Sequence, residues 1–243
     1  TAAAAARLPL QRAPTTNWNR TVRLLRGLGS DPADRYRAYV SHFRDAERAG
    51  LYTREYAELV GPSQAADVIG SAWRGASGTS VVDKVLQVDV ETYLADDLLV
   101  KADIATMAHS LEGRSPFLDH ELMEFAASVP PELKLRGMER KVLLRRALRA
   151  WLPDEILDRP KMGFGVPLRA WFRGELRGYV ADVLLDPAAT GRGYFEPARV
   201  KSLIDRHAAG VEDASSRLWT LLMHEWWHRE FVDQAAAVTP ERV

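Results

Sequence analysis

Apolar residues recur at the spacing of an α-helix along most of this 243-residue chain, and no other feature of the sequence constrains the fold as strongly. Alternating β-branched runs, which predict strands, are almost absent. Residues spaced i, i+3, i+4, i+7 and i+8 lie on one face of a helix. The clearest such set is Leu144, Ala147, Leu148, Trp151 and Leu152. We therefore predict a mainly α protein with roughly eight to ten helices and no sheet of its own.

Three sites carry the residues that favour the start of a helix. Asp31 precedes Pro32, Ser80 stands three residues ahead of Asp83, and Asp119 precedes an apolar run. Asp and Ser side chains accept hydrogen bonds from the free N–H groups of a first helical turn. Proline fits that turn because it has no N–H to leave unpaired. These sites predict helices that begin directly after residues 31, 80 and 119.

Two segments rich in glycine and proline predict breaks between the helical regions. Gly70 to Ser80 contains three Gly and three Ser, which favours a flexible joint. Arg159 to Pro167 contains two Pro and two Gly, which exclude regular structure, while apolar residues between them keep this loop attached to a core. We predict an N-terminal helical segment over residues 1–75 and a helical domain over residues 76–243.

Composition excludes several functions. Lys and Arg number 33 and Asp and Glu number 33, so the formal charge is zero and no field of one sign attracts nucleic acid. The absence of cysteine excludes disulfides, thiolate metal sites and a cysteine nucleophile. No apolar run reaches the ~20 residues of a membrane helix, because Asp96 and Asp97 interrupt Leu94 to Val100. We expect a soluble, cytoplasmic protein without nucleic-acid or membrane partners.

The segment from Asp96 to Asp119 combines many charged residues with many apolar ones. Because a solvated helix face needs few apolar residues, we expect carboxylates such as Asp103 at a boundary between core and solvent, paired with Lys101 or Arg114. The residues after this helix predict an extended crossing. From the residues alone, the simplest interpretation is that Glu112 and Arg114 form a partly buried ion pair that holds this crossing.

Several blocks of the sequence resemble the synthetase domain of glutamine-hydrolysing asparagine synthetases. The resemblance runs from about Val82 to Phe231. Its blocks are residues 96–119 with 122–130, Lys141 with 144–148, residues 152–156 and 159–167 with Trp171, and Leu218-Trp219 with Trp227. They follow one another in the order that the family shows.

This resemblance implies a reaction in two steps. ATP adenylates a carboxylate and releases pyrophosphate, and ammonia from glutamine then displaces AMP to form an amide. The family's lysine near the phosphates and the acyl-adenylate corresponds to Lys161, where a fixed ammonium offsets charge on departing oxygens. Asp103, Glu112 and Arg114 correspond to positions near the substrate pocket, without individual roles. The cofactor implied is ATP with Mg²⁺ in the complete enzyme, and none is expected on this part alone.

Departures from the family pattern are equally informative. The strand and Ser-Gly-Gly-x-Asp-Ser loop that hold ATP phosphates are missing, because Ser77 to Ser80 lacks the second Gly and the Asp. A later Gly-Glu-Gly-x-Asp-Glu segment and the glutaminase domain are also missing. The chain starts with Thr1 rather than Met, which suggests a cut inside a longer protein. We expect the helical carboxy-terminal portion of an α/β nucleotide-binding (PP-loop type) synthetase domain, without the sheet core. The expected partners are the rest of the synthetase, with its ATP-binding and glutaminase regions, and a second copy in a homodimer.

A competing motif is His224-Glu225-Trp226-Trp227-His228, the H-E-x-x-H pattern of zinc proteases. Two histidines supply too few zinc ligands, and the extended pattern H-x-x-G-x-x-H does not follow. Family relatives carry a core-packing helix here. We expect this helix to pack through Trp219, Leu222, Met223 and Trp226, with His224 and His228 on its outer surface. The other histidines, His207 among them, are expected at boundaries or on the surface.

Two alternatives to amide synthesis stay open from the sequence. One is a non-catalytic helical scaffold, or a partner-binding module, that keeps the family fold without its chemistry. The more remote one is a zinc hydrolase acting through residues 224–228. Neither predicts a role for Lys161.

Overall fold

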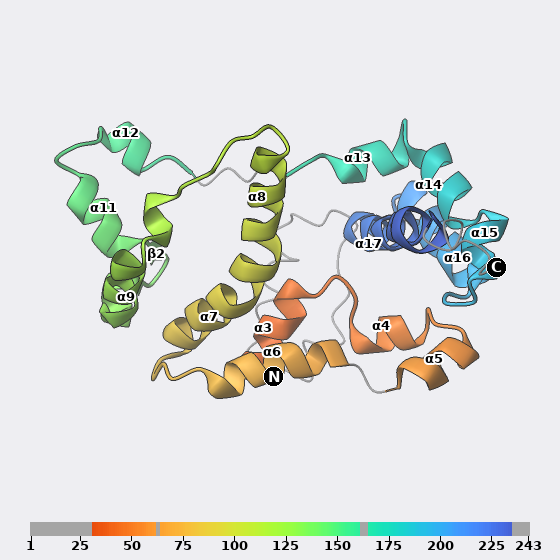
Figure 1. Ribbon diagram of the computed structural model, residues 1–243, viewed down its shortest axis with the longest axis horizontal. Coiled ribbons are helices and arrows are strands. Elements are labelled where there is room, and N and C mark those ends of the chain that lie inside the picture. Colours follow the sequence, from red (N-terminus) through yellow and green to blue (C-terminus); the bar gives the residue numbers. More distant parts are fainter. Residues whose placement is uncertain (1–30, 62–63, 161–164, 235–243) are drawn as a thin grey trace, which may run out of the picture. The chain divides into compact units, whose positions relative to one another are not determined.

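The computed structural model describes residues 31–61, 64–160 and 165–234 (Figure 1). These residues are mainly helical, as predicted, and form two compact units. Among the described residues, unit 1 comprises residues 31–61 and 165–234, and unit 2 comprises residues 64–160. Over the described ranges, no helix combines the length and the apolar character needed to cross a membrane. The division at residue 75 stays a prediction.

Unit 2 is built from a run of helices and one small hairpin. Its elements are α6 (Gln64–Gly75), α7 (Val81–Asp89), the π-helix η1 (Val90–Leu99), α8 (Val100–Met107), the 3₁₀-helix η2 (Pro116–Leu118), α9 (His120–Ser128), α10 (Pro131–Lys134), β1 (Leu135–Arg136), β2 (Glu139–Arg140), α11 (Val142–Leu148) and α12 (Asp154–Leu157). Helices α7, η1 and α8 follow one another without a break (Figure 1). The interior of this unit is small, and Val88 and Val142 are its fully buried side chains.

Local signals in the sequence place the helix starts correctly. The Asp31 carboxylate accepts a hydrogen bond from the Ala33 N–H at 2.8 Å. The Ser80 hydroxyl accepts from the Asp83 N–H at 3.0 Å, and the Asp119 carboxylate accepts from the N–H three residues on. A cap depends only on residues within one turn, so the sequence is sufficient to predict it.

Predictions that depended on longer segments needed correction. Helix α6 continues to Gly75, so only residues 76–80 connect α6 to α7, and the joint predicted over Gly70 to Ser80 is shorter. Helix α11 ends at Leu148 and leaves Trp151 exposed, although the periodicity predicts a helix through Leu152. The Arg149 and Trp151 N–H groups donate to carbonyls three residues back instead of four, so the regular helix ends there. Pro153 then disfavours helical geometry at Leu152.

The number and the kind of elements also differ from the prediction. The described residues contain fifteen α-helices, α3 to α17, because breakers divide several predicted helices into pieces as short as four residues. Strands β1 and β2 form an antiparallel hairpin with Leu135 paired to Arg140 and Arg136 paired to Glu139. Gly137 has a φ of +62° in its tight turn, a conformation that glycine adopts without strain. No larger sheet is present in the described ranges.

A half-buried ion pair joins two helices of unit 2. The Lys134 ammonium at the end of α10 lies 2.8 Å from the Asp83 carboxylate in the first turn of α7. Hydrogen bonds from Lys134 and from the Ser80 hydroxyl lower the pKa of Asp83. Lys134 also donates to the Ala127 carbonyl at 2.9 Å, so one ammonium ties α7, α9 and α10 together.

Unit 1 combines an early segment with the last third of the chain. Its elements are α3 (Pro32–Val40), α4 (Asp45–Ala49), α5 (Arg54–Val60), α13 (Leu168–Arg173), α14 (Arg177–Leu184), α15 (Pro187–Gly191), α16 (Pro197–Ala208), α17 (Ser215–Trp227) and the π-helix η3 (His228–Asp233). Backbone hydrogen bonds link its two parts, from the Thr53 N–H to the Tyr194 carbonyl and from the Glu196 N–H to the Leu51 carbonyl. Helices α13, α14 and α16 pack against α17 around one hydrophobic core.

Helix α17 buries a different face from the one predicted. Its buried residues are Leu218, Leu221, Leu222 and Glu225, followed by His228 at the start of η3. Of the residues expected in the core, Leu222 is buried whereas Trp219, Met223 and Trp226 are exposed. The prediction was wrong because apolar residues surround most of this helix, so periodicity alone does not select the buried side.

His207 is fully buried, which corrects its predicted place at a boundary or on the surface. Its Nδ1 atom accepts a hydrogen bond from the Ala214 N–H at 3.1 Å, and no described residue is a partner for Nε2. Burial lowers the pKa of this imidazole, and the nearby Arg173 guanidinium lowers it further. The side chain therefore stays neutral in the folded protein near neutral pH.

We expect His207 to make the protein less stable in mild acid. Below its ordinary pKa of 6.5 the unfolded chain takes up a proton that the folded chain excludes, so the free energy of unfolding falls until the pH reaches the lowered pKa. Urea denaturation from pH 7.5 to pH 5 checks this. The variant His207→Asn keeps an acceptor for the Ala214 N–H and should show a shallower fall, and an unchanged slope would contradict the assignment.

Candidate functional site

The predicted site residues of unit 2 lie around the end of helix α8. Ser110 closes this helix in a left-handed conformation with a φ of +58°. The Leu111 N–H donates to the Thr106 carbonyl at 3.1 Å, and the Ser110 N–H donates to the Met107 carbonyl at 2.9 Å. This pattern pairs the last carbonyls of a helix and reverses the chain.

After the reversal, the chain runs back beside α8. A Cβ atom added to Gly113 would lie 3.7 Å from Thr106 Oγ1, so the backbone at residue 113 contacts the last turn of the helix. Thr106 Oγ1 donates to the carbonyls of Ala102, at 2.9 Å, and Asp103, at 3.2 Å. The fold thus brings Glu112 and Arg114, the neighbours of Gly113, back to the turn of α8 that begins at Asp103.

Glu112 and Arg114 form the predicted ion pair, but it is not partly buried. Arg114 Nε donates to Glu112 Oε1 at 2.9 Å, and a second guanidinium nitrogen donates to Oε2 at 3.3 Å. The side chains are 84% exposed for Arg114 and 66% exposed for Glu112. An exposed pair of this kind contributes only about 0–1 kcal/mol to stability. Both groups are therefore accessible to a ligand or to another protein segment.

Asp103 is exposed on α8, and it forms no ion pair with another described residue. The predicted pairing of this carboxylate with Lys101 or Arg114 is therefore wrong. Arg114 instead binds Glu112, which is closer in sequence and reaches it across the extended crossing. The Asp103 carboxylate is left free to bind a cationic group.

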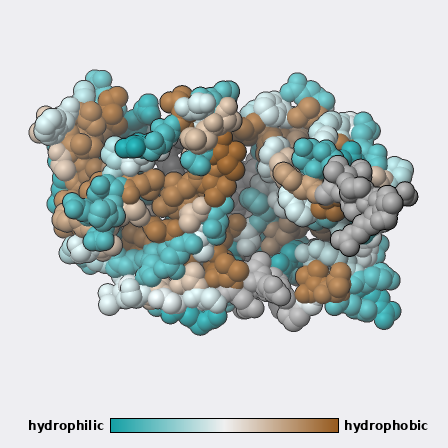
Figure 2. Space-filling model, viewed as in Figure 1, coloured by the Kyte–Doolittle hydropathy of each residue, from teal (hydrophilic) through white to brown (hydrophobic). Residues whose placement is uncertain are grey.

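The polar residues at this helix end are surrounded by exposed apolar side chains. Ile104, Met107, Leu111 and Phe117 are each more than half exposed. Figure 2 shows hydrophobic residues at the surface of this unit among hydrophilic ones. Apolar surface of this extent commonly marks a binding site or an interface. We refer to Asp103, Glu112, Arg114 and these four apolar residues as the α8 surface.

Lys161 lies outside the described residues, so its predicted position stays a prediction. The residues on either side of it, Arg159–Pro160 and Gly165–Pro167, have no regular secondary structure, as predicted for this loop. Helix α12 ends at Leu157 and α13 begins at Leu168. The sequence therefore predicts this loop correctly where the structure describes it.

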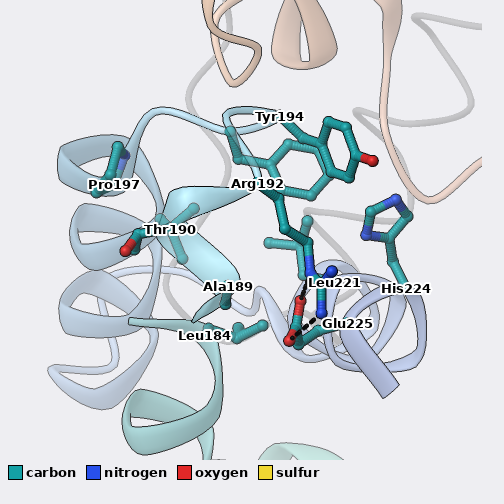
Figure 3. Close-up of a pocket in the computed structure, with 11 residues that line it drawn as sticks. Leu184, Ala189, Thr190, Arg192, Tyr194, Pro197, Leu221, His224 and Glu225 are labelled. Carbon is teal, nitrogen blue, oxygen red and sulfur yellow. Dashed lines mark hydrogen bonds and ion pairs between the residues drawn. The ribbon is translucent and has the colours of Figure 1, made fainter. Parts of the chain in front are cut away.

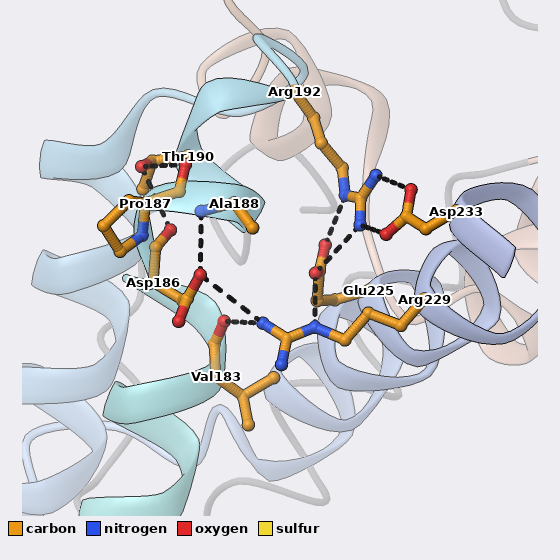
Figure 4. Close-up of polar contacts among 9 residues, drawn as sticks. All are labelled: Val183, Asp186, Pro187, Ala188, Thr190, Arg192, Glu225, Arg229 and Asp233. Carbon is orange, nitrogen blue, oxygen red and sulfur yellow. Dashed lines mark hydrogen bonds and ion pairs between the residues drawn. The ribbon is translucent and has the colours of Figure 1, made fainter. Parts of the chain in front are cut away.

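Unit 1 contains a polar site that the sequence does not predict. Arg192 follows α15 and donates to both oxygens of Glu225 on α17, at 2.7 and 3.2 Å (Figure 3). It also donates to both oxygens of Asp233, at 3.0 and 2.6 Å, and Arg229 donates to Glu225 at 2.7 Å (Figure 4). These four residues form the Arg192 network. They lie up to 41 residues apart in the sequence, so no local motif predicts the network.

The Arg192 network makes Glu225 unsuitable as a general base. Burial by itself raises the pKa of a carboxyl, but hydrogen bonds from Arg192 and Arg229 outweigh it and hold the pKa of Glu225 below its usual value. A carboxylate bound to two guanidinium groups is a poor general base. The described residues also contain no group of three or more side chains able to hold a metal ion. The described residues therefore give no support to the zinc-hydrolase alternative for residues 224–228.

Comparison with known proteins gives a consistent picture. The model of the asparagine synthase family matches residues 4–229. The glutamine-hydrolysing asparagine synthetase 1 of Bacillus subtilis is 36% identical over 162 residues, which are 67% of this chain and 25% of that protein. A putative asparagine synthetase of Mycobacterium tuberculosis is 39% identical over 170 residues, which are 70% of this chain and 26% of that protein. The human asparagine synthetase is 34% identical over 157 residues, which are 56% of this chain and 26% of that protein. No solved structure matches the chain.

These matches define a helical protein of the class that includes glutamine-hydrolysing amide synthetases. The resemblance predicted from Val82 onward is confirmed, and the family match extends it to residue 4. The chain belongs to the asparagine synthase family. It spans about a quarter of the length of the curated relatives that it matches.

Proposed function

We propose that this chain is the helical portion of an ATP-dependent, AMP-forming amide synthetase that uses ammonia from glutamine. The observation that carries the proposal is the α8 surface, where Glu112 and Arg114 lie on the segment that runs back beside the last turn of α8, the helix that carries Asp103, in a member of the asparagine synthase family. The proposed reaction forms a bond between a substrate carboxylate oxygen and the α-phosphorus of ATP, and pyrophosphate leaves. Ammonia then attacks the acyl carbon, AMP leaves with the bonding electrons, and the nitrogen releases one proton to give the neutral amide.

In this proposal the residues of the chain bind and orient the reactants. Lys161 offsets negative charge on the departing phosphate oxygens, because an ammonium held away from bulk water stabilises charge that develops there. Arg114, kept in place by Glu112, presents a planar cation that suits a carboxylate or a phosphate. Asp103 presents a negative charge suited to an amino group. We assign ATP with Mg²⁺ to the rest of the synthetase, because this sequence carries no Ser-Gly-Gly-x-Asp-Ser loop to hold the phosphates.

We further propose that the α8 surface packs against the rest of the synthetase, which supplies the ATP-binding and glutaminase regions. Ile104, Met107, Leu111 and Phe117 together expose more apolar area than a solvated helix end requires. A nucleotide-binding sheet that covers these side chains would also exclude water from the neighbouring polar residues. The same proposal places this chain inside a PP-loop type domain, in the cytoplasm and in a homodimer.

Pyrophosphate exchange in the full-length protein tests the proposal. An enzyme that adenylates a carboxylate incorporates labelled pyrophosphate into ATP when the acceptor acid is present, whereas a scaffold of the same fold does not. Aspartate is the first acid to assay, because relatives carry the name asparagine synthetase. The scaffold alternative is supported if no acid from a panel of amino acids and β-amino acids gives exchange above background.

Arg114→Ala is expected to lower kcat/KM for amide synthesis at least about tenfold, because it removes charge-assisted hydrogen bonds to the substrate. The melting temperature should stay within 1–2 °C of that of the wild type, as expected for an exposed ion pair. Arg136→Ala is the matched control, since it breaks another exposed Arg–Glu pair in unit 2. Equal kcat/KM values for the two variants would contradict a role for Arg114 at the site.

A further inference from the structure

Helix α17 ends with two histidines one turn apart, a feature that amide synthesis does not use. The His228 N–H donates to the His224 carbonyl, which is the i→i+4 bond of an α-helix. Two side chains at this spacing lie on one side of the helix, and an imidazole pair at i and i+4 is a common chelating arrangement for metals. The two rings therefore lie next to each other in unit 1.

The distance between the rings suits a shared metal ion. Their centres lie 4.7 Å apart, with an angle of 58° between the ring planes. A metal bound to one nitrogen of each ring at about 2.1 Å, with the two bonds near a right angle, needs ring centres about 4.6 Å apart. The separation of the two ring centres is therefore compatible with a shared metal ion.

Packing fixes this pair in place. His228 is 8% exposed, and its buried Nδ1 atom has no hydrogen-bond partner among the described residues. The ring of Tyr194 packs against both imidazoles, with centres 5.5 Å from His224 and 5.1 Å from His228. These ring contacts limit how far either imidazole can turn.

The charges around the pair do not repel a dication. Arg192 is bound by the carboxylates of Glu225 and Asp233, and Arg229 is bound by Glu225 and lies 3.8 Å from Asp186 (Figure 4). Each guanidinium is thus matched by carboxylate charge. The same contacts occupy Glu225, so the protein offers two imidazoles and no general base.

We propose that His224 and His228 form a two-imidazole binding site for a divalent transition metal ion of the Ni²⁺ or Cu²⁺ class. Imidazole is a preferred ligand for these ions, and water completes the coordination. The site binds a metal without hydrolytic chemistry, and it is independent of the proposed amide synthesis. A bound ion links the last turn of α17 to the first residue of η3.

Calorimetric titration of the untagged full chain with NiCl₂ tests the proposal. We expect one ion per chain for the wild type and at least tenfold weaker binding for both His224→Gln and His228→Gln. His120→Gln is the matched control, because His120 is exposed at the start of α9, and it should bind like the wild type. Wild-type affinity in His224→Gln, or no binding by the wild type, would overturn the proposal.

His228→Gln alters a buried side chain, so unfolding of this variant would also abolish its metal binding. A second, spectroscopic test therefore uses only the wild type and His224→Gln. Electron paramagnetic resonance of the wild type with one equivalent of Cu²⁺ should show coupling to two imidazole nitrogens. The spectrum of His224→Gln, which alters the less buried ring, should show coupling to one. A wild-type spectrum that is unchanged in this variant would place the ion elsewhere and refute the site.

Discussion

Replacing Lys161 by alanine in the full-length protein is expected to lower the rate of amide synthesis by about 10²–10³-fold, the usual effect of removing one preorganised group that stabilises charge in a transition state. Glutamine hydrolysis should continue, because the proposed role of this ammonium is confined to the phosphates and the acyl-adenylate. Amide product and free glutamate, measured in the same reaction, separate the two activities. Pyrophosphate exchange should fall together with amide synthesis, since both pass through the adenylate.

A lysine away from the proposed site provides the control for this experiment. Lys201 is exposed on α16 and forms an ion pair with Asp205 at 2.6 Å, one turn further along the helix. Lys201→Ala should therefore retain the wild-type rate of synthesis. If Lys161→Ala also synthesises amide at the wild-type rate, the role carried over from the family resemblance is wrong, although membership of the family would stand.

Replacing Leu222 by alanine is expected to lower the free energy of unfolding by about 2–5 kcal/mol, because it leaves a cavity in a packed core. Leu222 is 2% exposed on α17 and belongs to the hydrophobic core of unit 1. The next residue, Met223, is 41% exposed, so Met223→Ala should cost less than about 1 kcal/mol. Urea denaturation followed by circular dichroism measures both values.

This pair of variants tests which face of α17 is buried. The sequence predicts that Leu222 and Met223 share the core-facing side, whereas the structure buries only Leu222. Comparable losses of stability for the two variants would favour the prediction from sequence over the fold described above. A large loss for Leu222→Ala alone would support the packing of α13, α14 and α16 against this side of the helix.

The roles of Asp103, Glu112 and Arg114 come from the family resemblance and stay predictions, whereas the pairing of Glu112 with Arg114 could be predicted from the sequence because it is local. Asp103, Glu112 and Arg114 lie within twelve consecutive residues, and the reversal at Ser110 folds this short segment back on its own helix. The exposure of the Glu112–Arg114 pair could not be predicted in the same way. Exposure depends on which other segments cover a residue, and no element of the described chain covers this pair.

The burial of polar residues, in contrast, could not be predicted from the sequence. His207 and Glu225 look like ordinary surface residues in the sequence, yet both are buried. Glu225 is paired with Arg192, which lies 33 residues away, and His207 Nδ1 accepts a hydrogen bond from the Ala214 N–H across a turn. Burial of a charged group is tolerable only when such partners are present, and partners distant in sequence are brought together by packing.

The sequence by itself determined the helical character of the protein, the caps at Asp31, Ser80 and Asp119, and membership of its family, because each depends on residue identity within one turn or one motif. Only the tertiary structure decided which side of α17 is buried, how the Arg192 network forms and that the Glu112–Arg114 pair is exposed. The physical reason is that burial belongs to a residue together with its neighbours in space, and neighbours that are far apart in the chain are selected by packing of the whole unit.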